Sequence, residues 1–106
     1  MSLDITKIRT IVKQYVEDVR QIFKINKVFL YGSYAKGTAG KDSDVDVCFF
    51  LDSYGDIDRF DVRVLLLGMS HKYTDIYIEP MAFEVSDLYD DNPFVKEVLR
   101  TGIEIF

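Results

Sequence analysis

The chain contains one cysteine, Cys48, one histidine, His71, and no tryptophan. A single cysteine cannot form a disulfide within the chain, which is the pattern expected of a protein from the reducing cytoplasm. Structural zinc sites use about four cysteine and histidine ligands, and no cluster of these residues exists here. The sequence therefore predicts a cytoplasmic domain without zinc or disulfides.

Long hydrophobic runs and a secretion signal are also missing. No apolar stretch approaches the roughly 18 residues that a membrane-spanning helix needs, and the start of the chain has no secretory pattern. Acidic residues outnumber basic ones by 18 to 13, which gives a net charge of −5. This charge argues against a broad basic surface for nucleic acids. Neither a membrane nor a nucleic acid is therefore the expected partner.

What the chain does contain fits one globular domain covering residues 1–106. Hydrophobic residues make up 48% of the sequence, enough for an ordinary core. Periodicity and turn residues predict alternating helices and strands. The expected helices are a first one capped by Asp4 or Thr6 and reaching Phe23, a second over 57–70 and a last one over 93–100. The expected strands are 28–31, 45–51, 74–79 and 103–106.

These elements predict an α/β (α+β) fold, with a small mixed β-sheet flanked by helices. Pro80 is expected to stop the third strand, because proline cannot donate a backbone hydrogen bond. In the second helix the residues expected to face inward are Ile57, Phe60, Val64, Leu65 and Leu67. Cys48, on the second strand, is expected to be a core residue.

The segment from 32 to 50, GSYAKGTAGKDSDVDVCFF, carries the chemistry. Gly32 and Ser33 end one apolar run, and Asp44 and Asp46 open the next. Alternate residues of a strand share a face, so the two carboxylates should project side by side. Their repulsion is offset by a divalent cation, and oxygen ligands of this kind suit Mg²⁺. The Gly-Ser turn can place a backbone N–H and a hydroxyl against phosphate oxygens.

Taken together, G-S-x(10)-D-x-D resembles the signature of nucleotidyltransferases of the DNA polymerase beta superfamily. The short chain and its Gly-Ser-x-Ala-Lys-Gly start are similar to the minimal nucleotidyltransferase (MNT) group. The resemblance covers roughly residues 5 to 106 and is strongest at 28 to 50. It implies the nucleotidyltransferase fold, an ATP or other nucleoside triphosphate substrate, and two Mg²⁺ ions, with Mn²⁺ as the alternative.

A third acid is needed for two metal ions, and the third expected strand offers Asp75 and Glu79. They lie too far apart along a strand for both to join Asp44 and Asp46. We favour Asp75, because the third acid of the resembled family precedes a short hydrophobic run. Asp44, Asp46 and Asp75 are thus the expected catalytic and metal-binding residues, with Asp75 as proton acceptor. Gly32, Ser33 and a lysine, Lys36 or Lys41, are expected to bind the phosphates.

The expected acceptor of the nucleotide is a protein hydroxyl, because the catalytic parts leave no second domain to hold a different acceptor. Members of the resembled group are often antitoxins paired with a HEPN-domain toxin ribonuclease, and some transfer AMP to a toxin tyrosine. Two alternatives stay open: a non-catalytic module that neutralises a partner by contact, and an enzyme acting on a small molecule such as an aminoglycoside. The sequence leaves a homo-oligomer open as well.

Overall fold

Four strands form a mixed sheet in the order β3-β2-β1-β4. The structure is a computed structural model that describes residues 4–37, 39 and 44–106. The strands are β1 (Ile25–Tyr31), β2 (Val45–Leu51), β3 (Ile78–Glu84) and β4 (Ile103–Glu104). β2 runs antiparallel to β1 and parallel to β3, and β4 runs antiparallel to β1. The mixed sheet predicted from the sequence is confirmed.

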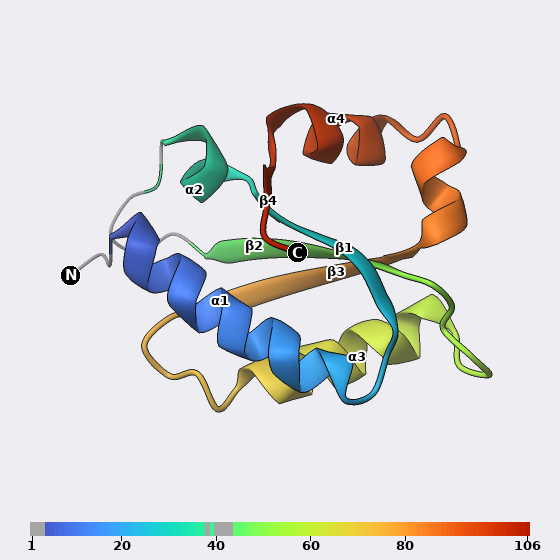
Figure 1. Ribbon diagram of the computed structural model, residues 1–106, viewed down its shortest axis with the longest axis horizontal. Coiled ribbons are helices and arrows are strands. Elements are labelled where there is room, and N and C mark those ends of the chain that lie inside the picture. Colours follow the sequence, from blue (N-terminus) through green and yellow to red (C-terminus); the bar gives the residue numbers. More distant parts are fainter. Residues whose placement is uncertain (1–3, 38, 40–43) are drawn as a thin grey trace.

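Helices cover both faces of this sheet (Figure 1). The helices are α1 (Ile5–Arg20), α2 (Ser33–Lys36), α3 (Arg59–Ser70) and α4 (Pro93–Thr101), with a short 3-10 helix, η1 (Val85–Tyr89). One core lies between the sheet and α1 and α3, and a second lies between the sheet and α4. β2 contributes to both cores, because its residues point alternately to the two faces. This explains why its sequence is almost continuously apolar.

α1 begins and packs as its sequence predicts. Of the two candidate caps, Asp4 is the one that precedes the helix, and its side chain accepts a hydrogen bond from the backbone N–H of Lys7. Buried residues recur at intervals of three and four, from Ile8 to Val19. The hydroxyl of Tyr15 donates a 2.5 Å hydrogen bond to the carbonyl of Leu66 and so joins α1 to α3.

The inward face of α3 differs from the expected one. The buried residues are Val62, Leu66 and Ser70, whereas Ile57, Phe60, Val64 and Leu65 are exposed. Asp58 accepts a hydrogen bond from the backbone N–H of Asp61 and starts the helix at Arg59. The sequence of α3 has apolar residues on more than one side of the helix. The side that contains Leu66 faces inward, where the carbonyl of Leu66 accepts a hydrogen bond from Tyr15 of α1.

The third strand also differs from its predicted bounds. It was expected at 74–79 with Pro80 as its stop, but it runs from Ile78 to Glu84 and contains Pro80. Proline is tolerated there because β3 lies at the edge of the sheet, where a residue without an N–H can face outward. Asp75 consequently lies in the turn before the strand, and Glu79 lies within it.

No helix in the described part of the chain combines the length and the apolar character that crossing a bilayer requires. The longest, α1, has 16 residues and carries a polar outer face.

Candidate active site

Gly32 stands where β1 ends and α2 begins, and its backbone lies against Asp46. Its φ of +71° belongs to the region that favours glycine. A Cβ atom at this position would lie 2.3 Å from Oδ2 of Asp46, far inside contact distance. Position 32 therefore requires glycine for two independent reasons, and the second of them is the carboxylate of Asp46.

Asp46 is the middle member of a row that crosses three strands. In the register of the sheet it pairs with Tyr31 of β1 on one side and with Glu79 of β3 on the other. Neighbouring strands lie about 4.8 Å apart, so side chains in one row are close together. Asp44, two residues before Asp46, directly precedes β2. We call Tyr31, Asp46 and Glu79 the acid row.

The electrostatics of this row show that its negative charges interact. The pKa of Asp46 is raised, first by burial of the half-buried side chain and then by the charges of Asp44 and Glu79. The pKa of Tyr31 is raised well above its usual value by burial and, next, by Asp46. Burial raises the pKa of Cys48, on the same face, to about 12. Tyr31 and Cys48 therefore stay protonated at neutral pH, and the carboxylates carry the charge.

One basic side chain reaches Glu79 directly. Arg63 of α3 donates a 2.7 Å hydrogen bond from Nη2 to Oε1 of Glu79 and a 3.2 Å hydrogen bond from Nε to the carbonyl of Pro80. Both side chains of this ion pair are partly exposed to solvent. Glu79 thus has a fixed cationic partner in the structure.

Asp75, favoured from the sequence as the third acid, is not brought to this row. It is exposed and lines a hollow against the first half of α1, together with Thr6, Lys7, Thr10 and Ile11. The reason is that β3 starts later in the chain than predicted, so that Glu79 is the residue that pairs with Asp46. Both acids are candidates in the sequence, and the start of β3 at Ile78, which the edge position of Pro80 permits, distinguishes them.

The expected phosphate-binding residues lie on or beside the short helix α2. Ser33 is its first residue and is partly buried. Lys36 is its last residue, and its Nζ lies 3.7 Å from Oε1 of Glu97 on α4. Lys41, the other lysine considered, falls outside the described residues. Gly32 therefore lies against Asp46, with Ser33 next to it in the chain, whereas Lys36 is directed toward α4.

The donor set near Asp46 fits a cation that uses few protein ligands. Within residues 4–37, 39 and 44–106, no three His, Cys, Asp or Glu side chains are grouped so that they could hold a metal ion. Mg²⁺ commonly takes one or two carboxylates and completes its octahedron with water and phosphate oxygens. Asp44 and Asp46 satisfy that requirement, because they are two carboxylates at alternate positions beside the backbone of Gly32.

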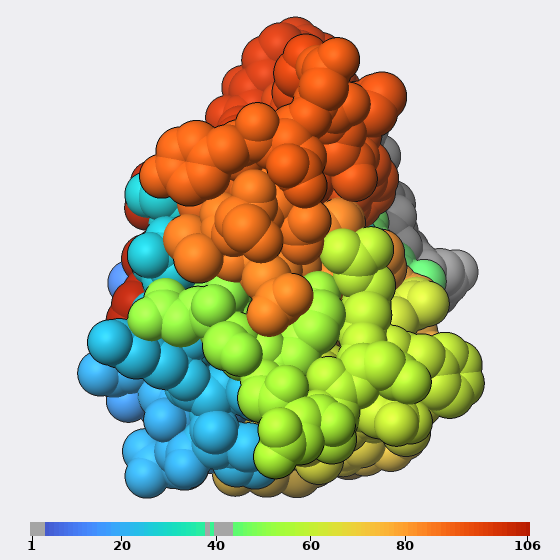
Figure 2. Space-filling model, turned by 90° about the vertical axis from the view of Figure 1, so that its right-hand side faces the viewer, coloured from blue at the N-terminus to red at the C-terminus, as the bar shows by residue number. Residues whose placement is uncertain are grey.

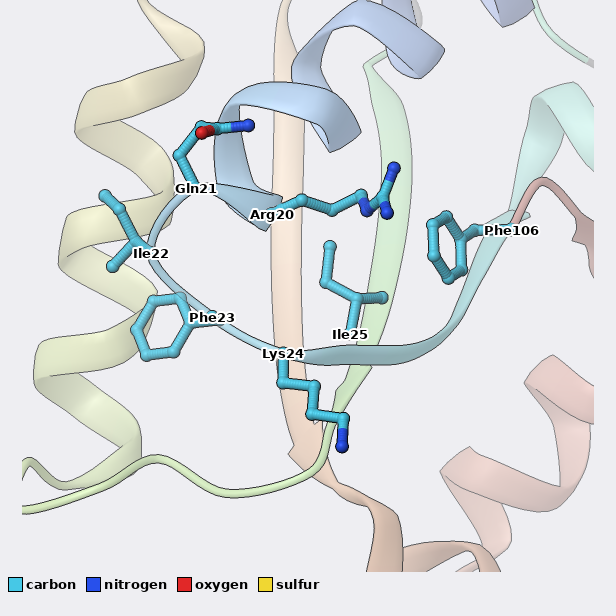
Figure 3. Close-up of a pocket in the computed structure, with 7 residues that line it drawn as sticks. All are labelled: Arg20, Gln21, Ile22, Phe23, Lys24, Ile25 and Phe106. Atoms are coloured by element: carbon cyan, nitrogen blue, oxygen red, sulfur yellow. The ribbon is translucent and has the colours of Figure 1, made fainter.

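A larger hollow lies at the opposite end of β1 and contains no acidic side chain (Figure 3). It has a volume of about 440 Å³. Arg20 extends toward Phe106, and both residues line this hollow, with the guanidinium carbon 5.1 Å from the ring centroid. At this end of β1, Ile25 pairs with Leu51, six residues away from the pairing of Tyr31 with Asp46. This hollow is therefore separate from the acid row.

Comparison with known proteins gives matches that span most of the chain. The profile of the nucleotidyltransferase domain family matches residues 12–100. A protein of Methanocaldococcus jannaschii, provisionally named a protein adenylyltransferase, is 30% identical over 98 residues. The aligned region covers 90% of this chain and 95% of that protein.

Solved structures share the fold at lower sequence identity. A provisionally assigned nucleotidyltransferase from Sulfolobus solfataricus has a TM-score of 0.64 at 19% identity, covering 93% of this chain and 79% of that one. A toxin–antitoxin complex with AMP-PNP has a TM-score of 0.66 at 19% identity, covering 92% and 72%. A variant of the toxin–antitoxin pair MntA–HpeT has the same TM-score at 16% identity and the same coverage.

Proposed function

The chain belongs to the nucleotidyltransferase domain family, and we propose that it transfers AMP from ATP to a hydroxyl group on a protein. The observation that carries the proposal is the convergence of Gly32 and Glu79 on Asp46. A tight glycine turn beside a pair of neighbouring carboxylates is an arrangement suited to a triphosphate and its cation. ATP is a cytoplasmic substrate, so the proposal places the protein in the cytoplasm.

Asp44 and Asp46 are the residues we assign to hold Mg²⁺, or Mn²⁺ in its place. The bound cation would supply charge neutralisation for the triphosphate and the leaving pyrophosphate. The backbone at Gly32 and the hydroxyl of Ser33 orient the phosphates from the end of β1, because the glycine permits a close approach. A second ion, which the sequence resemblance implies, would need Glu79 in addition to the two aspartates.

Glu79 is our candidate for the proton acceptor, in the role that the sequence analysis gave to Asp75. The acceptor oxygen attacks the α-phosphorus, its proton passes to a carboxylate oxygen of Glu79, and the bond to pyrophosphate breaks. The register places Glu79 one strand away from Asp46, so a hydroxyl between them would contact both.

The protein acceptor and the partner are supported by similarity. The Methanocaldococcus jannaschii relative, which this chain covers almost completely, is named for adenylylation of proteins. Two of the structural neighbours are toxin–antitoxin complexes, one of them with a nucleotide analogue. We therefore infer that the acceptor is a toxin and that this chain is its antitoxin, and we propose the HEPN type of toxin because the sequence resemblance implies it.

Neutralisation of a partner by contact alone is a second candidate, favoured by the exposed apolar residues of α3. Phe60, for example, is 72% exposed. Exposed apolar side chains that lie together are typical of interaction surfaces. Under this alternative, substitution of Asp46 leaves the neutralisation unchanged.

Calorimetry with ATP tests the enzymatic proposal. We expect ATP binding that requires Mg²⁺ and that is weakened at least ten-fold in Asp44→Asn and Asp46→Asn, because each loses a cation ligand. Asp75→Asn is the matched control and should bind as the wild type does. ATP binding that is equal with and without Mg²⁺ would remove the basis of the proposal.

Incubation with α-labelled ATP and a candidate toxin partner tests the acceptor. The expected result is AMP covalently attached to that toxin by wild-type protein and not by Asp46→Asn. Full inhibition of the toxin by both proteins, without added AMP, would favour neutralisation by contact.

A further inference from the structure

Two arginines of α3, one helical turn apart, reach around the outer edge of β3. The buried face of α3, with Val62 and Leu66, packs on the α1 side of the sheet. Glu79 and Phe83 lie at alternate positions of β3 that point to the other side, where Phe83 joins the second core. Arg63 nevertheless bonds Glu79, and the guanidinium carbon of Arg59 lies 4.7 Å from the ring centroid of Phe83.

This edge lies on the surface drawn in Figure 2, where α3 meets the segment that follows β3. Arg59 extends the same contact, because it also pairs with Asp87 of η1 at 3.2 Å. The two arginines thus hold equivalent positions on one helix and differ in what they reach.

Pro80, in the edge strand, provides one of the two hydrogen-bond acceptors of Arg63. Because Pro80 has no N–H, the backbone there offers an acceptor and no donor. Its carbonyl accepts a hydrogen bond from Nε of Arg63, and Nη2 of the same guanidinium donates a hydrogen bond to Glu79. The guanidinium is therefore fixed by two bonds next to the acid row rather than extended into solvent.

The charge of Arg63 acts on the acid row. The pKa of Tyr31 is raised mainly by burial and also by the charges of Asp46 and Glu79. The charge of Arg63 lowers this pKa. The row has carboxylates at Asp46 and Glu79 in adjacent strands, with Asp44 directly before β2, so several negative charges lie close together. The positive charge of Arg63 beside Glu79 partly compensates these negative charges when no divalent cation is bound.

We propose that Arg63 is a positioning residue that serves as the internal counter-ion of the site and competes with a divalent cation for the carboxylate of Glu79. The proposal rests on the proposed function, since it takes Glu79 as the carboxylate that a further cation would add to Asp44 and Asp46. Arg63 lies outside the Gly-Ser and Asp-x-Asp motif. Its ion pair with Glu79 lowers the affinity of the site for the cation. Removing Arg63 frees Glu79 for the cation.

Binding of Mn²⁺ to the full chain without nucleotide, measured by calorimetry at low salt, tests this. Arg63→Gln should bind Mn²⁺ about five-fold more tightly than the wild type, the size expected for a partly exposed ion pair of about 1 kcal/mol. Arg63→Lys keeps the charge and should return the affinity most of the way to the wild-type value. The gain in Arg63→Gln should shrink at 0.5 M salt, on the order of a 4 Å screening length.

Arg59→Gln is the matched control, because it removes an arginine from the same helix that also pairs with an acid. It should leave Mn²⁺ affinity unchanged even where it lowers thermal stability. Glu79→Gln should weaken Mn²⁺ binding, and adding Arg63→Gln to it should change the affinity no further. A merely structural role for Arg63 would not produce this dependence on Glu79.

Mn²⁺ affinity in Arg63→Gln that equals or falls below the wild-type value overturns the inference and leaves the proposed function standing. So does a gain that persists in the Glu79→Gln background. Absence of Mn²⁺ binding by the wild type, with and without ATP, overturns the proposed function and this inference with it.

Discussion

Gly32 and Asp46 are fitted to each other: a methyl group on Gly32 would lie 2.3 Å from Oδ2 of Asp46. The two residues are 14 positions apart in the sequence; Gly32 lies between β1 and α2, and Asp46 lies in β2. Their contact ties the glycine turn after β1 to the carboxylate in β2. The spacing of the motif therefore has a direct physical meaning, because the turn must pass over the acid.

Gly32→Ala should destabilise the protein and abolish Mg²⁺-dependent ATP binding. The substitution adds backbone strain of about 1 kcal/mol or more at positive φ and forces the Asp46 carboxylate to move. Gly55→Ala is the control, since Gly55 has the same φ of +71° and nothing within 4 Å of its Cβ position. Urea unfolding and calorimetry with ATP measure the two effects. Equal losses in both variants would mean that only backbone strain is involved.

Glu79→Gln should reduce nucleotide transfer by at least 100-fold, the usual scale for loss of an acid–base residue. Asp75→Asn should keep nearly full activity, because Asp75 lies against α1 and away from Asp46. Both changes are close to isosteric, so circular dichroism should show an unchanged fold. The measurement is the rate of label transfer from ATP. Loss of transfer in Asp75→Asn alone would return the role of third acid to Asp75.

Asp46→Asn should stabilise the protein at neutral pH. The pKa of Asp46 is raised in the folded state by burial and then by Asp44 and Glu79, so folding favours the protonated form. Its carboxyl therefore supports folding in acid, and this support is lost as the pH rises from about 3.9, the unfolded value, through the higher folded value.

Urea unfolding of the wild type and of Asp46→Asn across pH 3 to 7 measures this prediction. The stability gain of the variant should be near zero at pH 3 and should grow to a plateau above the folded pKa. A gain that is independent of pH would contradict the assigned electrostatic cause.

Tyr15→Phe should lower the free energy of unfolding by about 1 kcal/mol, which is the net value of one buried hydrogen bond. The lost bond is the 2.5 Å contact between the hydroxyl and the carbonyl of Leu66. For a domain of this size the melting temperature should fall by roughly 4–8 °C.

Tyr73→Phe is the comparison for this variant, because Tyr73 bonds Asp18 at the surface and packs edge-on against Tyr15. Its effect should be smaller, since a partly exposed partner recovers water contacts. A larger loss in Tyr73→Phe would show that the link between α1 and α3 lies elsewhere.

Elements with strong local signals were predicted closely. The strand over 45–51 is confirmed at both ends, because seven nearly continuous apolar residues have few alternatives to a buried strand. The last helix begins at Pro93, as predicted, and the side chain of Asn92 accepts hydrogen bonds from the next backbone N–H groups. Burial of Cys48 in the core is confirmed as well.

Two features depended on tertiary context that local sequence does not encode. The third strand was predicted four residues too early, because Pro80 is a stop in a central strand and is tolerated in an edge strand. The inward face of α3 was predicted wrongly, because the side chain that selects it, Tyr15, lies 51 residues before Leu66. The acid beside Asp46 follows from the first of these features.

β3 has a consequence for how this protein behaves at high concentration. An edge strand with unpaired N–H and C=O groups is a template for aggregation through strand pairing. At Pro80 this edge has no backbone N–H to donate, and the carbonyl of Pro80 already accepts a hydrogen bond from Arg63. The middle of the edge is therefore closed to an incoming strand from another copy, so Pro80 and Arg63 together oppose aggregation through this edge.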